Sequence, residues 1–155
     1  VRAMPNLAAG VGKSVTCFSA GTLATNEDIQ LAEEIFDSFG SSVRLDEKSL
    51  DAASVLSGGG PAFFFYFAKK MEEAGVKSGI DAATAGKRAR SALVGAAAMA
   101  ENSQETVGEL IDKVATPGGF TRAALDSFDS SKIGDSIAEA VRLAKEKCAD
   151  IGGEK

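Results

Sequence analysis

Five consecutive aromatic residues, Phe63–Phe67 (FFFYF), constrain the fold of this chain more than any other feature. Pro61 suits the first position of a helix, and the pattern from there to about Ala74 is helical. Because side chains project in all directions round a helix, these aromatic groups surround most of it, and no polar side chain appears until Lys69. The pattern predicts a helix that is buried on all sides.

The next predicted helix, residues 82–100, carries small side chains where the previous one carries large ones. Ala85, Ala89, Ala92 and Ala96 form a stripe along one face. Small side chains let helix backbones approach closely. About a hundred residues of one protomer cannot cover both helices, so we expect an obligate homodimer, possibly a higher oligomer of dimers. Its interface should bury well over ~2,000 Å², as permanent dimers do.

The first 46 residues have a different pattern from the rest. The sequence predicts short strands at residues 14–18 and 42–45, with a helix between them that Thr25 and Asp28 cap and Gly40 ends. Two strands are too few for a stable parallel sheet. Residues 1–46 therefore look like the end of a larger α/β domain, and residues 47–155 like an all-helical domain.

We expect the helical domain to contain five further helices besides the one over 82–100. Their predicted ranges are 50–56, 61–74, 107–114, 120–128 and 131–151. The capping-box pair Thr106 and Glu109 begins the 107–114 helix. The expected fold class is mainly α, a helical bundle preceded by a short β-α-β segment.

Composition excludes several function classes. The net charge of -5 leaves no basic surface for nucleic acid, and no apolar run is long enough to span a membrane. With no signal-peptide pattern and only two cysteines, we expect a soluble cytoplasmic protein. The chain has no histidine, which removes Ser-His-Asp triads and zinc-protease helices, and we expect no metal site.

Two glycine-containing stretches imitate nucleotide-binding motifs without meeting their requirements. In GVGKS (residues 10–14) the first glycine of a P-loop would have to stand at Leu7, and a strand-like run follows where a helix is needed. SGGGPAF (residues 57–63) follows a helix and has Phe63 in place of the last glycine of a dinucleotide fingerprint. We interpret the second stretch as a tight turn whose glycines adopt positive φ angles.

A third stretch, TPGGFT (residues 116–121), opens a turn between two predicted helices. If Thr116 caps the second helix, the amides of Gly118, Gly119, Phe120 and Thr121 lie in or near its first turn. Such amides lack partners within the helix, and the helix dipole favours an anion there. The turn then suits a small carboxylate, with the Thr116 and Thr121 hydroxyls as further donors. A plain connection between two helices explains the same residues equally simply.

Four motifs occur in the order and at about the spacing found in pyrroline-5-carboxylate reductases. They are RAMPN (2–6), LSGGGPAF (56–63), AGVKSGI (74–80) and VATPGGFT (114–121). The chain resembles the last β-α-β of that family's Rossmann domain followed by its helical dimerisation domain. The resemblance implies an oxidoreductase of proline biosynthesis that reduces the C=N bond of a small imine, 1-pyrroline-5-carboxylate, with NADPH or NADH.

The resemblance also implies roles for single residues. Met4, Pro5 and Asn6 match the loop beside the cofactor. The substrate loop is matched by Val114, which lines the pocket, and by Thr116, Gly118, Gly119, Phe120 and Thr121, which bind the carboxylate. Thr121 also matches the catalytic hydroxyl near the ring nitrogen. Phe120 stands where a smaller residue is common, and Leu7 and Ala8 replace a usual Thr-Pro.

Two alternatives remain open at this point. Another two-domain imine or ketone reductase, of the 6-phosphogluconate-dehydrogenase-like group, would be favoured by a Lys or His in the pocket loop, which has neither. A non-catalytic dimerisation module is favoured by the missing G-x-G-x-x-G fingerprint. For the same reason we expect this chain by itself to be inactive and to bind dinucleotide weakly, most of the cofactor being held by residues outside this sequence.

Overall fold

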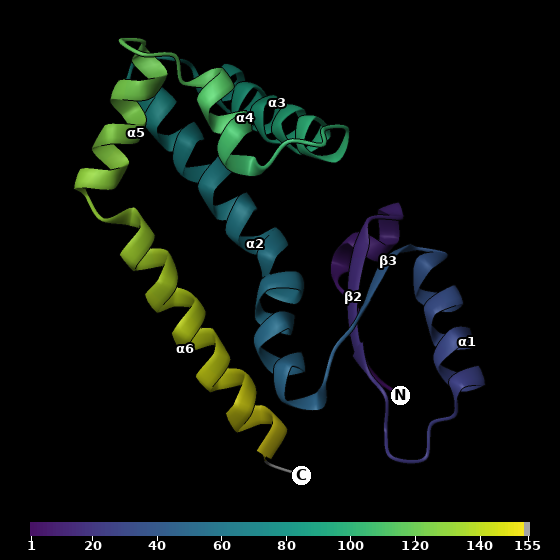
Figure 1. Ribbon diagram of the computed structural model, residues 1–155. Coiled ribbons are helices and arrows are strands. Elements are labelled where there is room, and N and C mark those ends of the chain that lie inside the picture. Colours follow the sequence, from purple (N-terminus) through teal and green to yellow (C-terminus); the bar gives the residue numbers. More distant parts are fainter. Residues whose placement is uncertain (154–155) are drawn as a thin grey trace. The chain divides into compact units, whose positions relative to one another are not determined.

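A computed structural model describes residues 1–153, except the side chains of residues 149 and 151–153 (Figure 1). The chain divides into two compact units. The N-terminal unit comprises Val1–Phe63 and the residues from Glu139 onward, and the helical unit comprises Phe64–Ala138. This division follows compactness, so the domain boundary expected after residue 46 stays a prediction.

The N-terminal unit contains a three-stranded sheet in the order β1-β2-β3. Its elements are β1 (Arg2–Met4), the 3-10 helix η1 (Leu7–Val11), β2 (Ser14–Ser19), α1 (Asn26–Asp37) and β3 (Gly40–Arg44). β2 and β3 are parallel, with Ser14 opposite Gly40, and α1 connects them, which confirms the predicted β-α-β unit (Figure 1). β1 pairs antiparallel with β2 and was not predicted.

The helix α1 begins as predicted but ends earlier. The Thr25 side chain accepts a hydrogen bond from the Asp28 amide (3.2 Å), and the Asp28 carboxylate accepts one from the Thr25 amide (2.8 Å). The expectation that Gly40 ends this helix was wrong, because Gly40 is the first residue of β3. A Cβ atom at Gly40 would lie 2.0 Å from the Ser14 carbonyl oxygen, so this glycine permits the close approach of the two strands.

The predicted break between residues 56 and 61 does not exist. A single helix, α2 (Glu47–Lys77), runs through it with Pro61 inside. None of Gly58, Gly59 and Gly60 has a positive φ angle, so the tight-turn interpretation was wrong. Pro61 has no amide hydrogen to donate to the Ser57 carbonyl four residues earlier, and the Asn6 side-chain nitrogen donates to that carbonyl instead, at 2.7 Å.

The aromatic run of α2 is exposed in the single chain, in line with the expectation that one protomer cannot cover it, and its burial on all sides stays a prediction that depends on a second copy. Phe64 is 64% exposed, and Phe63, Phe65, Tyr66 and Phe67 are exposed as well. Phe67 packs edge-on against Phe128, with ring centroids 6.0 Å apart. One chain thus covers only part of this surface.

The helical unit contains the second half of α2 and three complete helices. They are α3 (Ala82–Glu101), α4 (Val107–Val114) and α5 (Phe120–Ser130), and α6 (Ile133–Gly153) follows. Small residues allow α2 and α3 to approach: a Cβ atom at Gly75 would lie 3.3 Å from that of Ala85. No helix among residues 1–153 is long and apolar enough to cross a membrane.

Candidate functional site

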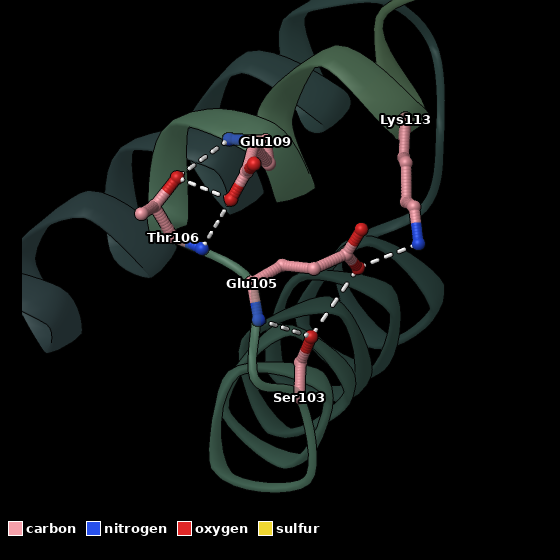
Figure 2. Close-up of polar contacts among 5 residues, drawn as sticks. All are labelled: Ser103, Glu105, Thr106, Glu109 and Lys113. Atoms are coloured by element: carbon pink, nitrogen blue, oxygen red, sulfur yellow. Dashed lines mark hydrogen bonds and ion pairs between the residues drawn. The ribbon is translucent and has the colours of Figure 1, made fainter.

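The candidate substrate loop follows α4, whose start the sequence fixes through a capping box (Figure 2). The Thr106 hydroxyl accepts from the Glu109 amide at 3.3 Å, and the Glu109 carboxylate accepts from the Thr106 amide at 2.7 Å. The hydrogen bond from the Thr106 amide is the largest cause that lowers the pKa of Glu109. This box confirms the predicted helix start.

A second polar contact connects the last turn of α4 to the residue before its N-cap. Lys113, in its last turn, donates to the Glu105 carboxylate at 2.5 Å, and the Ser103 hydroxyl donates to the same oxygen at 3.3 Å (Figure 2). The hydrogen bond from Lys113 is the largest cause that lowers the pKa of Glu105. The positive charge of Lys113 also suits the C-terminal end of a helix.

After α4 the chain forms a tight turn. Ala115, 1% exposed, ends the helix, and the Gly119 amide donates to the Thr116 carbonyl oxygen at 3.0 Å. Pro117 and Gly118 are the two central residues, and Gly118 has φ = 74°. Proline followed by a residue of positive φ is the signature of a type II turn, and glycine adopts that angle at position 118 without strain.

Gly119 is required for a different reason. A Cβ atom at this position would lie 2.9 Å from the Thr116 hydroxyl oxygen and 3.1 Å from its carbonyl oxygen. The two glycines are therefore not interchangeable in function. Gly118 supplies a backbone angle, whereas Gly119 supplies space.

Helix α5 begins at Phe120 with Gly119 as its N-cap, which corrects the expectation that Thr116 caps this helix with Pro117 in its first position. The reason is that the type II turn uses Thr116 and Pro117. No side chain caps α5, in contrast to α1, α3 and α4, where Thr25, Asp81 and Thr106 do. The amides of Phe120 and Thr121 thus lie in an uncapped first turn, as predicted, while the Gly119 amide is engaged in the turn.

Arg122 holds the two ends of this loop together, and the sequence analysis missed it. Its guanidinium donates to the Asp112 carboxylate at 2.8 Å and to the Ala115 carbonyl oxygen at 3.1 Å. We call these contacts the Arg122 clasp. The signal in the sequence was a pair of opposite charges flanking the Pro-Gly-Gly turn.

The predicted loop residues differ in exposure. Phe120 is 90% exposed, Val114 and Thr116 are exposed, and Thr121 is half-buried. The Thr121 hydroxyl has no hydrogen-bond partner among the described residues. The structure thus brings Val114 and residues 116–121 together in one turn that presents uncommitted donors.

The predicted cofactor residues Met4, Pro5 and Asn6 form a separate group in the N-terminal unit. They connect the end of β1 to η1, with Pro5 exposed and Met4 and Asn6 half-buried. The Asn6 side chain caps η1 by accepting from the Ala8 amide at 3.0 Å. Among the described residues no three His, Cys, Asp or Glu side chains lie close enough to hold a metal ion.

Comparison with known proteins decides the family. The family model described as pyrroline-5-carboxylate reductase dimerisation matches residues 47–151. The chain belongs to the pyrroline-5-carboxylate reductase family. It is 37% identical over 152 residues to the pyrroline-5-carboxylate reductase of Methanosarcina acetivorans and 31% identical over 151 residues to pyrroline-5-carboxylate reductase 2 of Bacillus subtilis.

These alignments cover 98% and 97% of this chain but 56% and 54% of the relatives, so the chain spans about half the length of the curated relatives it matches. Solved structures of the same family also match nearly the whole chain. A pyrroline-5-carboxylate reductase from Coxiella burnetii superposes with a TM-score of 0.90 at 28% identity, covering 96% of this chain and 56% of that one.

The pyrroline carboxylate reductase from Plasmodium falciparum, a structure with NADP bound, gives a TM-score of 0.85 at 29% identity. That match covers 97% of this chain and 62% of the Plasmodium chain. The fold is thus the expected one, mainly α with a short β-α-β segment ahead of the family's dimerisation region.

Proposed function

We propose that this chain supplies the substrate loop and the dimer interface of a pyrroline-5-carboxylate reductase, a cytoplasmic enzyme that makes L-proline. The observation that carries the proposal is the uncapped start of α5 directly after the turn formed by Thr116–Gly119. Family membership supports the assignment, because the relatives that match nearly the whole chain bear that name.

In this proposal the start of α5 binds the carboxylate of the imine. The amides of Phe120 and Thr121 face an anion favourably because they lack helical partners and lie at the positive end of the helix dipole. Gly118 and Gly119 shape the turn that exposes them, and Thr116 adds a hydroxyl. Val114 and Phe120 contribute apolar surface beside the ring.

The Thr121 hydroxyl is the proposed catalytic group. It has no partner within the described residues, so it is available to hydrogen-bond the ring nitrogen of the imine. When bound, NADPH or NADH supplies the hydride for the C=N carbon. The protein's contribution is position and polarity, which suits a chain without histidine.

The loop Met4–Asn6 offers the nicotinamide end of such a cofactor mainly apolar surface, because the Asn6 side-chain amide already bonds to Ser57 and Ala8. These three side chains are uncharged, with an exposed proline and a half-buried methionine. They suit the nicotinamide riboside better than a phosphate, which calls for cations or helix amides. The NADP bound to the Plasmodium relative supports a nicotinamide dinucleotide here too.

The exposed aromatic run supports a homodimer as the working form. Side chains of this size stay in water in the single chain, and the matching family model is one of dimerisation. A second copy that covers them gains about 25 cal/mol for each Å² of apolar surface removed from water.

The test is the kinetics of Thr121 variants in the full-length protein, followed by oxidation of NADPH with pyrroline-5-carboxylate as substrate. Thr121→Ala should lower kcat/KM by about 10- to 1,000-fold, a loss of ~1.4 to 4 kcal/mol of transition-state stabilisation. Since Gly119 and not Thr121 is the N-cap, stability should change little.

Thr121→Ser is the matched control, because it keeps the hydroxyl and should keep most activity. Wild-type kcat/KM in Thr121→Ala would contradict the role of Thr121 while leaving carboxylate binding possible. A full-length protein that forms dimers but never turns over this imine would favour the alternative of a non-catalytic dimerisation module.

A further inference from the structure

Pro61 leaves one carbonyl of α2 without its helical donor. In an α-helix the amide of each residue donates to the carbonyl four residues earlier, and proline has no amide hydrogen. The group deprived of a partner is the carbonyl of Ser57. A half-buried carbonyl without a donor is costly, so continuation of α2 through this point requires a substitute.

The substitute comes from the loop after β1. The Asn6 side-chain nitrogen donates to the Ser57 carbonyl oxygen at 2.7 Å. The orientation of this amide follows from its other contact, because its oxygen accepts from the Ala8 amide at 3.0 Å. The Asn6 side chain therefore makes two hydrogen bonds of opposite polarity, one to its own loop and one to α2.

Asn6 is itself held from the side of the sheet. Its backbone amide donates to the Ser14 hydroxyl at 3.2 Å, and that hydroxyl lies 3.2 Å from the Thr16 hydroxyl, both residues being buried in β2. On the α2 side, the Cys17 thiol donates to the Ser57 hydroxyl at 3.5 Å. β2, the Asn6 loop and α2 thus meet at Ser57.

We infer that Asn6 supplies the hydrogen bond that Pro61 removes from α2, and that it thereby positions the loop Met4–Asn6. Asn6 is a positioning residue in this assignment and acts on the cofactor through the loop. A second contact holds the same segment to α2, since Arg2 donates to Asp51 at 2.5 Å. The positioning role rests on the proposed function, whereas the hydrogen-bond replacement does not.

A double-mutant cycle on the full-length protein tests the replacement. Asn6→Ser keeps a side chain that caps η1 but is too short to reach the Ser57 carbonyl. We expect it to lower the equilibrium constant for folding, measured by urea unfolding, by about 5- to 30-fold. Pro61→Ala restores the helical amide, so in that background Asn6→Ser should cost less than about 3-fold.

Pro117→Ala provides the control background, because it removes a proline that has no relation to Ser57. There Asn6→Ser should cost as much as in the wild type. Equal losses in all three backgrounds would overturn the inference that Asn6 replaces the missing donor.

Kinetics test the positioning role separately. Asn6→Ser should raise KM for NADPH by about 3- to 10-fold with a smaller change in kcat, and adding Pro61→Ala should not restore KM, because the loop remains released from α2. An unchanged KM for NADPH in Asn6→Ser overturns the positioning role. If the proposed function is wrong, the wild-type protein will show no turnover of the imine. The unfolding cycle then still tests whether Asn6 replaces the hydrogen bond that Pro61 removes.

Discussion

The two units of this chain bury very different side chains. The N-terminal unit has large groups in its interior, with Phe18 fully buried against Phe36 at 5.5 Å between ring centroids, and Leu50 fully buried on α2. Among the described residues of the helical unit only alanines are buried: Ala85, Ala89 and Ala115. The N-terminal unit thus has a core within one chain, whereas the helical unit keeps its large apolar groups on the surface.

This difference indicates where a second copy is needed. Apolar burial is the main favourable term in folding, and alanines contribute little of it. Helix caps and ion pairs in the helical unit fix local geometry, yet exposed ion pairs contribute at most about 1 kcal/mol each. We therefore expect the helical unit to depend on dimerisation for its stability, and the N-terminal unit to depend on Phe18.

The largest expected effect comes from a charge in the exposed aromatic run. Phe65→Asp should abolish the dimer, because a carboxylate would be buried in each half of the interface without a partner. Light scattering should then report monomers at micromolar concentration, and hydrogen exchange in α3 should accelerate. Leu23→Glu is the control, since Leu23 is 93% exposed in a turn of the N-terminal unit and should tolerate the charge. A Phe65→Asp dimer of wild-type stability would show that the helical unit does not depend on this aromatic surface for dimerisation.

A core deletion in the N-terminal unit should rank second. Phe18→Ala should cost about 3 to 5 kcal/mol, the usual range for a buried phenylalanine. Hydrogen exchange should accelerate in β2 and α1 at every protein concentration, whereas the stability of α3 should depend on concentration. Ile35→Ala, on the exposed face of α1, is the matched control and should cost less than about 1 kcal/mol. Equal acceleration in β2 and α3 would show that the two units unfold together.

Removing the Arg122 clasp tests whether polar contacts hold the substrate loop in place. Among its described residues the helical unit buries no large side chains that could do so within one chain. Arg122→Ala should cost about 1 to 2 kcal/mol, because it removes both the ion pair with Asp112 and the hydrogen bond to the buried Ala115. Under the proposed function it should also raise KM for the imine in the full-length protein by roughly 3- to 10-fold, as the turn loosens. Asp112→Ala keeps the bond to Ala115 and should have the smaller effect on both. The reverse order would mean that the ion pair, and not the bond to Ala115, holds the loop.

The smallest effects come from the two capping boxes, one in each unit. Thr25→Ala and Thr106→Ala should each cost about 1 kcal/mol, as a lost N-cap does. Because the boxes share the same chemistry, a larger loss for Thr106→Ala would show that α4 has less support from its surroundings than α1.

Acid should weaken both boxes in the same direction. Hydrogen bonds from Thr25 lower the pKa of Asp28, and those from Thr106 lower the pKa of Glu109. A lowered folded-state pKa contributes stability above the unfolded pKa of about 4, and this is lost as pH falls through the folded value. The difference in urea midpoint between wild type and Glu109→Gln should therefore be present at neutral pH and shrink below about pH 4. A difference that persists at pH 2 would contradict this assignment.

Short-range sequence patterns predicted several elements of the fold correctly. The boxes at Thr25 and Thr106 predicted the starts of α1 and α4 correctly, because each needs only residues three positions apart. The strand-like run after GVGKS correctly argued against a P-loop, and it forms β2. The four motifs also identified the family, which the comparisons confirm. The roles of the site residues remain proposals, since they depend on a bound substrate and cofactor.

Non-local contacts decided the rest. Gly-Gly-Gly-Pro predicts a break by local propensity, yet α2 continues through it because Asn6, 51 residues away from Ser57 in sequence, supplies the lost hydrogen bond. Thr116 resembles an N-cap, but the turn closed by the Gly119 amide moves the start of α5 to Phe120. By itself the sequence determined the helix starts that carry a capping box, at Thr25 and Thr106, and which family's motifs stand in order. Only the tertiary structure decided which backbone groups find partners, because those partners come from residues that no local pattern connects.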